Sequence, residues 1–359
     1  MIRSVALVLG GLCSCVVALE LLFRVLPVST ATLTGYHVDP DLLTYPPRHE
    51  FRVATGWDLR NAQVVRANAQ GFAARRDFQT DPAAIALIGD SYVEASMLPE
   101  ADRPGVQLES ALASKRPVYA MGGPGSSLLD YAQRVRWAAQ NHGVRDFVLL
   151  LERFDARQAL CGSGNVHSRC LAPQTLEPRV ERQPEPSTLK RLLRHSAFAQ
   201  YMVSQVGFTP GALVGAMFSR QTPEHAAEPA SKPKPAAPTE SQRLAADRMV
   251  NAVVDEFYAV AGPHLAGRIV FLVDGQRDRV AQEDARSTLG AYERVRLIAA
   301  LQRRGAGVVD LEPVYLEHGA TSDFSLNVGP YDGHLNALGV KLVMAEAARH
   351  LALQPGVSR

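Results

Sequence analysis

The feature that most constrains the fold of this chain is a series of short, mostly apolar runs, each followed by a turn. They cover residues 84–88, 117–121, 147–151, 268–273 and 308–311. Because these runs are apolar throughout instead of alternating, they are typical of parallel strands that are buried on both faces. Helical patterns lie between and after them, at 107–113, 128–141 and 336–353. The sequence therefore predicts an α/β fold, a three-layer sandwich with a central parallel sheet.

The N-terminus carries a different signal. Ser4 to Phe23 is a run of twenty residues whose only charge is Glu20, and at about 1.5 Å per residue a helix of this length crosses a hydrocarbon core of about 30 Å. We expect one uncleaved transmembrane anchor at residues 1–25. A cleaved signal peptide is the first alternative, but no Ala-x-Ala site follows the run. A lipoprotein signal around Cys13 and Cys15 is the second, and it does not need the apolar stretch that continues beyond them.

An anchor of this kind places the remainder of the chain outside the cytoplasm. We expect a single-pass protein of a bacterial-type inner membrane with its folded domain in the periplasm. Residues 26–80 form an N-terminal extension, and 81–355 form the α/β domain. That domain contains an insertion at about 156–246, in which 222–242 is rich in Pro, Ala, Glu and Lys and is expected to be flexible. Apolar residues at helical spacing over 189–201 predict a helix packed on the core, with a membrane-surface helix as the alternative.

The cysteines fit that placement. Cys161 and Cys170 enclose a short loop with Gly and Ser, and in an oxidising compartment we expect them to form a disulfide, worth about 2–4 kcal/mol. A metal site formed by these two residues and His167 is the alternative. It lacks a fourth nearby ligand and the usual Cys-x-x-Cys spacing. We expect neither a metal nor a cofactor.

Three motifs carry chemical groups. Gly89-Asp90-Ser91 directly follows the first run of the α/β region, where a serine hydroxyl can lie at the carboxyl edge of the sheet. Gly122-Gly123-Pro124-Gly125 follows the second run, and backbone N–H groups there can face a developing oxyanion. Asp332-Gly333-His334 precedes the last helix, and a carboxylate two residues from an imidazole can fix its tautomer.

Together these motifs resemble the SGNH, or GDSL, hydrolase family, and they occur in the order of that family. The stretch Asn68-Ala69-Gln70-Gly71-Phe72 also looks like the segment that precedes the first strand in membrane-anchored members. The resemblance covers about 68–155 and 265–350 and leaves the insertion unexplained.

The resemblance implies a role for each residue. Ser91 would be the nucleophile, His334 the general base and acid, and Asp332 the residue that orients His334. Asp90 would shape the turn. The N–H groups of Ser91 and Gly125 would bind the oxyanion, with Gly122 in the same turn.

One element of the family pattern is missing. The third oxyanion donor of the family is an Asn after the third strand, and the corresponding stretch here, Glu152-Arg153-Phe154-Asp155, contains none. The Asn that usually opens the glycine motif is replaced by Ala120. Either Arg153 or a residue of the 156–170 loop contributes instead, or the chain is a non-catalytic glycan-binding descendant. The joint presence of Ser91, Asp332 and His334 favours activity.

The expected function is a serine ester hydrolase that removes or transfers O-acetyl groups on a polysaccharide or cell-wall glycan. A lipid or small-ester hydrolase and a glycan-binding protein without turnover are the alternatives. A membrane protein that donates acyl groups is a possible partner. Nucleic acid is not an expected partner, because 38 Lys and Arg residues nearly balance 36 Asp and Glu residues.

Overall fold

The computed structural model describes residues 2–208, 237–277 and 288–353. The chain forms two compact units. The first comprises Met1–Thr32, Phe51–Val65 and Glu185–Lys234, and the second comprises Leu33–Glu50, Arg66–Pro184 and Pro235–Arg359.

The second unit is built on a five-stranded parallel sheet with the order β11-β10-β7-β5-β6. The strands are β5 (Ile85–Gly89), β6 (Val118–Gly122), β7 (Asp146–Leu151), β10 (Ile269–Val273) and β11 (Gly307–Asp310). Each begins and ends within two residues of the run that predicted it. Gly89 pairs with Gly122 on one side and with Leu150 on the other, so three strands end at the same edge.

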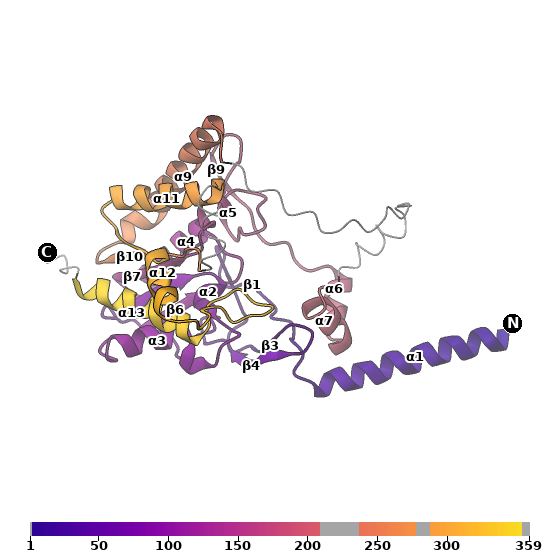
Figure 1. Cartoon of the computed structure of the whole chain (residues 1–359). Coiled ribbons are helices and arrows are strands. Elements are labelled where there is room, and N and C mark those ends of the chain that lie inside the picture. Colours follow the sequence, from indigo (N-terminus) through magenta and orange to yellow (C-terminus); the bar gives the residue numbers. More distant parts are fainter. Residues whose placement is uncertain (1, 209–236, 278–287, 354–359) are drawn as a thin grey trace. The chain divides into compact units, whose positions relative to one another are not determined.

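Helices cover both faces of this sheet (Figure 1). On one face lie α4 (Leu128–His142), α9 (Glu240–Ala261) and α11 (Leu289–Arg303); on the other lie α3 (Pro104–Ala111), α12 (Glu312–Thr321) and α13 (Ala337–Leu353). Ala86 and Ile88 of β5 enter the first core, whereas Ile85 and Leu87 enter the second. This alternation within a fully buried strand explains why the runs are apolar throughout. The predicted three-layer α/β sandwich with a parallel sheet is confirmed.

The predicted insertion is wrong at its C-terminal end. Helix α9 begins at Glu240, inside the stretch expected to be flexible, because Thr239 and Gln242 form a capping box. Its Val250, Val253 and Phe257 are buried in the core of the sandwich. The predicted flexible stretch at 222–242 otherwise lies mostly outside the described residues.

Shorter elements complete the unit. Two small antiparallel pairs are formed by β1 (Gly35–Asp39) with β2 (Leu42–Thr44) and by β8 (Arg169–Leu171) with β9 (Pro178–Val180). Short helices follow two of the sheet strands, α2 (Ser91–Glu94) after β5 and α5 (Asp155–Gln158) after β7, and two single 3₁₀ turns span Glu100–Asp102 and Gly262–His264.

The first unit contains α1 (Ile2–Val25), α6 (Thr188–Leu193) and α7 (Ala197–Ser204), together with most of the two-stranded sheet of β3 (Glu50–Thr55) and β4 (Arg60–Arg66). Arg3–Val25 has a mean hydropathy of 2.4 and none of it is buried. By length and composition this one helix suits either a membrane anchor or a signal sequence.

The amphipathic segment at 189–201 belongs to this unit and not to the α/β core. Glu20 of α1 accepts hydrogen bonds from the Ser196 hydroxyl at 2.8 Å and from the backbone N–H of Phe198 at 3.0 Å, at the start of α7. The rings of Phe23 and Tyr201 stack with centroids 4.1 Å apart. Within this unit, the aromatic face of the segment packs on α1.

Gly122 allows a test of the close packing between the end of β6 and α2. A Cβ on Gly122 would lie 2.6 Å from the Cα of Glu94 and would clash with its backbone nitrogen, so we expect Gly122→Ala to lower the free energy of unfolding by about 1–3 kcal/mol. Gly262→Ala is the control, since a Cβ there meets nothing within 4 Å. Urea unfolding of both variants measures the difference, and equal stabilities would contradict the close packing of β6 on α2.

Candidate active site

The turn from β5 to α2 presents the Ser91 hydroxyl at the carboxyl edge of the sheet. Ser91 is the first residue of α2, and Asp90 caps the helix by accepting a hydrogen bond from the Tyr92 N–H at 2.8 Å. Asp90 is buried, and burial raises its pKa to about 6, against the hydrogen bond from Tyr92 and the charges of His334 and Arg134. Asp90 therefore shapes the turn, in the position that the sequence predicts.

Ser91, His334 and Asp332 lie in one hydrogen-bonded line. His334 Nε2 is 2.8 Å from Ser91 Oγ, although the two residues are 243 positions apart. His334 Nδ1 is 2.5 Å from Asp332 Oδ1, which also accepts the His334 backbone N–H at 2.9 Å. The loop before α13 thus presents one imidazole nitrogen to a hydroxyl and the other to a carboxylate, and this arrangement can transfer a proton from the hydroxyl.

The electrostatics of the pair strengthen this arrangement. Burial acts to lower the pKa of His334, but the hydrogen bond and charge of Asp332, together with the charge of Asp90, raise it overall. Burial acts to raise the pKa of Asp332, and the hydrogen bonds from His334 lower it overall. Asp332 is thus held ionised, and it stabilises the imidazolium that forms when His334 accepts a proton.

Arg277, which the motifs do not indicate, holds the loop of His334. Its nearly buried guanidinium pairs with Asp274 at 2.8 Å, at the end of β10. It also donates to the Asn327 side chain at 2.8 Å and to the Gly333 carbonyl at 2.6 Å. Arg277 therefore connects the sheet edge to the residue that precedes His334.

The glycine turn lies beside the end of β5. The Gly123 N–H donates to the Gly89 carbonyl at 3.1 Å. Gly125 has φ +66°, a left-handed conformation that favours glycine. Among the described residues, neither the Ser91 N–H nor the Gly125 N–H has a hydrogen-bond acceptor. Gly122, in contrast, is required by the close approach of Glu94.

Arg153 does not contact this turn. Its guanidinium donates to the Gln276 side chain, lies 3.5 Å from Glu152 and sits 5.0 Å from the centroid of the Phe154 ring. The structure thus brings Ser91, Asp332 and His334 together and places Arg153 on another wall of the site.

A cavity of about 410 Å³ adjoins His334. It is lined by Tyr92, Glu152, Arg153, Asp274, Gly275, Gln276, Arg277, Asn327, Gly333 and His334. The sequence motifs assign no role to Glu152. Burial raises its pKa to about 7, so near neutral pH it exchanges a proton within reach of the site.

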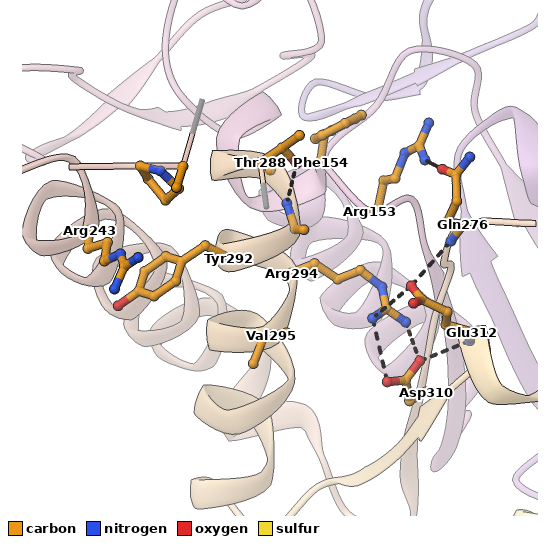
Figure 2. Close-up of a pocket in the computed structure, with 14 residues that line it drawn as sticks. Arg153, Phe154, Arg243, Gln276, Thr288, Tyr292, Arg294, Val295, Asp310 and Glu312 are labelled. Carbon is orange, nitrogen blue, oxygen red and sulfur yellow. Dashed lines mark hydrogen bonds and ion pairs between the residues drawn. The ribbon is translucent and has the colours of Figure 1, made fainter. Parts of the chain in front are cut away.

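A larger cavity of about 800 Å³ shares Arg153 and Gln276 with the first. Figure 2 shows Arg153 extending toward Gln276, and Arg294 between Asp310 and Glu312. Phe154 and Tyr292 add aromatic surface to this cavity. The two cavities together offer a small polar compartment and a wider, partly aromatic one.

The predicted disulfide between Cys161 and Cys170 is present. Among the described residues, the one grouping suited to a metal ion is these two cysteines with Glu181. Because the two sulfurs are bonded to each other, they do not act as thiolate ligands. The His167 imidazole is buried, and burial lowers its pKa to about 3. The alternative of a metal site at Cys161, His167 and Cys170 is therefore not supported.

The contact between Asp332 and His334 makes a prediction for titration. Asp332→Asn removes the charge and the acceptor that raise the pKa of His334, so we expect that pKa to fall. NMR of histidine-labelled protein measures it, with Asp255→Asn on α9 as an exposed control that should leave the His334 signal unchanged. A pKa that stays the same in Asp332→Asn would contradict the described contact.

The chain was also compared with known proteins. Its sequence matches no protein-family model and no curated protein. Among solved structures it is similar to LAE5, an α/β hydrolase from the metagenome of Lake Arreo, Spain, with a TM-score of 0.41 and 12% identity over 77% of this chain and 99% of that one. A member of the G-D-S-L family of lipolytic proteins from Veillonella parvula DSM 2008 has a TM-score of 0.40 and 11% identity over 76% of this chain and 99% of that one. Est24, a carbohydrate acetylesterase from Sinorhizobium meliloti, has a TM-score of 0.35 and 11% identity over 75% of this chain and 98% of that one. These values are too low to assign a function.

Proposed function

We propose that this protein is a membrane-anchored serine esterase that removes or transfers O-acetyl groups on a glycan outside the cytoplasm. The observation that carries this proposal is the hydrogen-bonded line from Ser91 through His334 to Asp332. It lies beside two backbone N–H groups that have no acceptor among the described residues.

The geometry supports acyl transfer in two steps. Ser91 Oγ attacks the ester carbonyl while His334 Nε2 takes its proton, and the negative charge that forms on the carbonyl oxygen is stabilised by the N–H groups of Ser91 and Gly125. When the tetrahedral intermediate collapses, the bond to the sugar oxygen breaks and His334 protonates that oxygen. A water molecule or a second hydroxyl, deprotonated by His334, then attacks the acyl-enzyme and releases Ser91.

The cavities favour a small acyl group on a larger polar body. The compartment beside His334 is small and lined by charged and polar side chains, so it suits an acetyl ester better than a long alkyl chain. The wider cavity next to it combines the rings of Phe154 and Tyr292 with Arg153 and Arg243, groups that pack on sugar rings and bind their oxygens.

The location is part of the same proposal. An apolar α1 of sufficient length and a disulfide in the α/β unit both fit a chain that is anchored in the inner membrane and folded in the periplasm. There, a membrane protein that supplies acyl groups would be its partner if the reaction is a transfer.

Ser91→Ala tests the reaction. We expect the variant to lose turnover of p-nitrophenyl acetate and of an acetylated glycan by a factor of roughly 10⁴ to 10⁶, because the nucleophile is gone. Ser110→Ala, an exposed serine on α3, is the matched control and should keep full activity. Undiminished turnover by Ser91→Ala would exclude the mechanism.

The same variants separate an enzyme from a binding protein. A fluorophosphonate probe should label the wild-type chain and not Ser91→Ala, since only an activated serine reacts. A wild-type chain that binds glycan and takes no label would instead support the glycan-binding alternative. Release of acetate from acetylated glycan, compared with hydrolysis of a long-chain ester, separates the proposed substrate class from a lipid.

The location has its own test. Alkaline phosphatase fused after Arg359 should be active, and β-galactosidase at the same position inactive, because only the phosphatase folds outside the cytoplasm. The reverse pattern would place the catalytic unit in the cytoplasm and contradict the proposed topology.

A further inference from the structure

The disulfide loop brings a free side-chain amide to the glycine turn. Asn165 Nδ2 lies 3.9 Å from the position that a Cβ would occupy on Gly125. In the described part of the chain, the Asn165 side chain has no hydrogen-bond partner, and only its backbone N–H is bonded, to Ser163 Oγ at 3.1 Å. An amide held beside Gly125 with its donors unused is placed to bind a ligand oxygen at this turn.

The loop that carries this amide is held by covalent and polar contacts. The Cys161–Cys170 disulfide closes the loop. One oxygen of the buried Asp130 carboxylate accepts the His167 N–H of the loop at 3.0 Å, and the other accepts the Ser127 N–H at 2.9 Å. Since Ser127 is two residues after Gly125, a single carboxylate ties the loop to the glycine turn.

We propose that Asn165 is a catalytic residue that donates a hydrogen bond from Nδ2 to the oxyanion formed when Ser91 attacks the ester. This inference rests on the proposed esterase function. In that step a bond forms between Ser91 Oγ and the carbonyl carbon, the π electron pair of the carbonyl moves to its oxygen, and the Ser91 proton passes to His334. The oxygen then carries a full negative charge beside three N–H donors, those of Ser91, Gly125 and Asn165.

Other polar residues near the edge are engaged elsewhere. Arg153, the candidate donor from the sequence, directs its guanidinium to Gln276 and packs on Phe154. The buried Asp155 accepts a hydrogen bond from the Glu152 N–H at 3.0 Å, which stabilises the turn after β7. Burial raises the pKa of its carboxyl group. The loop amide is thus the side-chain donor that the described structure brings to Gly125.

Two substitutions at Asn165 test the role. Asn165→Ala should lower kcat on p-nitrophenyl acetate by about 10²–10³-fold with little change in KM, because the donor acts on the transition state. Asn165→Asp keeps the shape but adds a negative charge, and it should lower kcat further than Ala does. Asn141→Ala is the matched control, since its amide bonds within its own helix to the Trp137 carbonyl at 3.0 Å, and it should leave kcat unchanged.

Reduction of the disulfide gives a second readout that a merely structural role would not produce. Dithiothreitol should lower kcat of the wild-type protein, because the loop no longer holds the amide in place. It should have little further effect on Asn165→Ala, which has no donor to lose. Equal losses in the two proteins would overturn the inference that the loop acts through Asn165.

The outcomes separate this inference from the function on which it rests. A wild-type chain with no ester turnover and no fluorophosphonate labelling would overturn both. Wild-type turnover that depends on Ser91, together with unchanged kcat in Asn165→Ala, would overturn the role of Asn165 alone. All measurements use the full chain in detergent, and urea unfolding of each variant identifies losses that come from unfolding.

Discussion

The candidate site depends on a buried arginine that holds the end of the strand before Ser91. Arg134 of α4 is 1% exposed, and its Nη1 donates to the carbonyl of Gly89, which ends β5, at 2.7 Å. Burial lowers the pKa of Arg134, and the charges of Asp130, Asp90 and Glu94 oppose that effect. A guanidinium keeps its proton under these conditions, so one cation compensates buried carboxylates in the turn before Ser91 and at the start of α4. The absence of a side chain on Gly123 leaves the space that this guanidinium occupies.

The sheet and the three catalytic candidates were accessible from the sequence because each has a local signature. A strand buried on both faces must be apolar at every position, as 85–89 is, and a serine or an Asp-x-His can be read from neighbouring residues. Helix α9 was missed because the Pro-rich composition before Thr239 extends the apparent linker up to its capping box. The packing of α7 on α1 was missed because no local pattern indicates that Glu20, a charge in an apolar segment, would accept hydrogen bonds from α7.

The supporting residues of the site were less predictable, since their roles exist only in the folded chain. Arg277 acts through contacts with Asp274, Asn327 and Gly333, which come from separate loops. The position of Arg153 directly after β7 made it a reasonable oxyanion donor, but its guanidinium turns to Gln276. Asn165 lies in a loop whose path is set by a disulfide and by Asp130, and sequence spacing does not reveal which residue of such a loop faces the glycine turn.

These contacts also explain how a loop far from the sheet strands could serve the proposed reaction. The Ser91 hydroxyl and the backbone donors follow β5 and β6 at the carboxyl edge of the sheet, where parallel strands open a crevice, and His334 comes from the loop before α13. A side-chain donor must reach the same point from outside the sheet, and a free loop would lose much of the benefit to the entropy of ordering it. The disulfide restricts the loop before substrate binds. The Asp130 carboxylate of α4 also holds the loop through the His167 N–H. In the proposed reaction, preorganisation of this kind would let one amide hydrogen bond act on the transition state without reorganising the loop at each turnover.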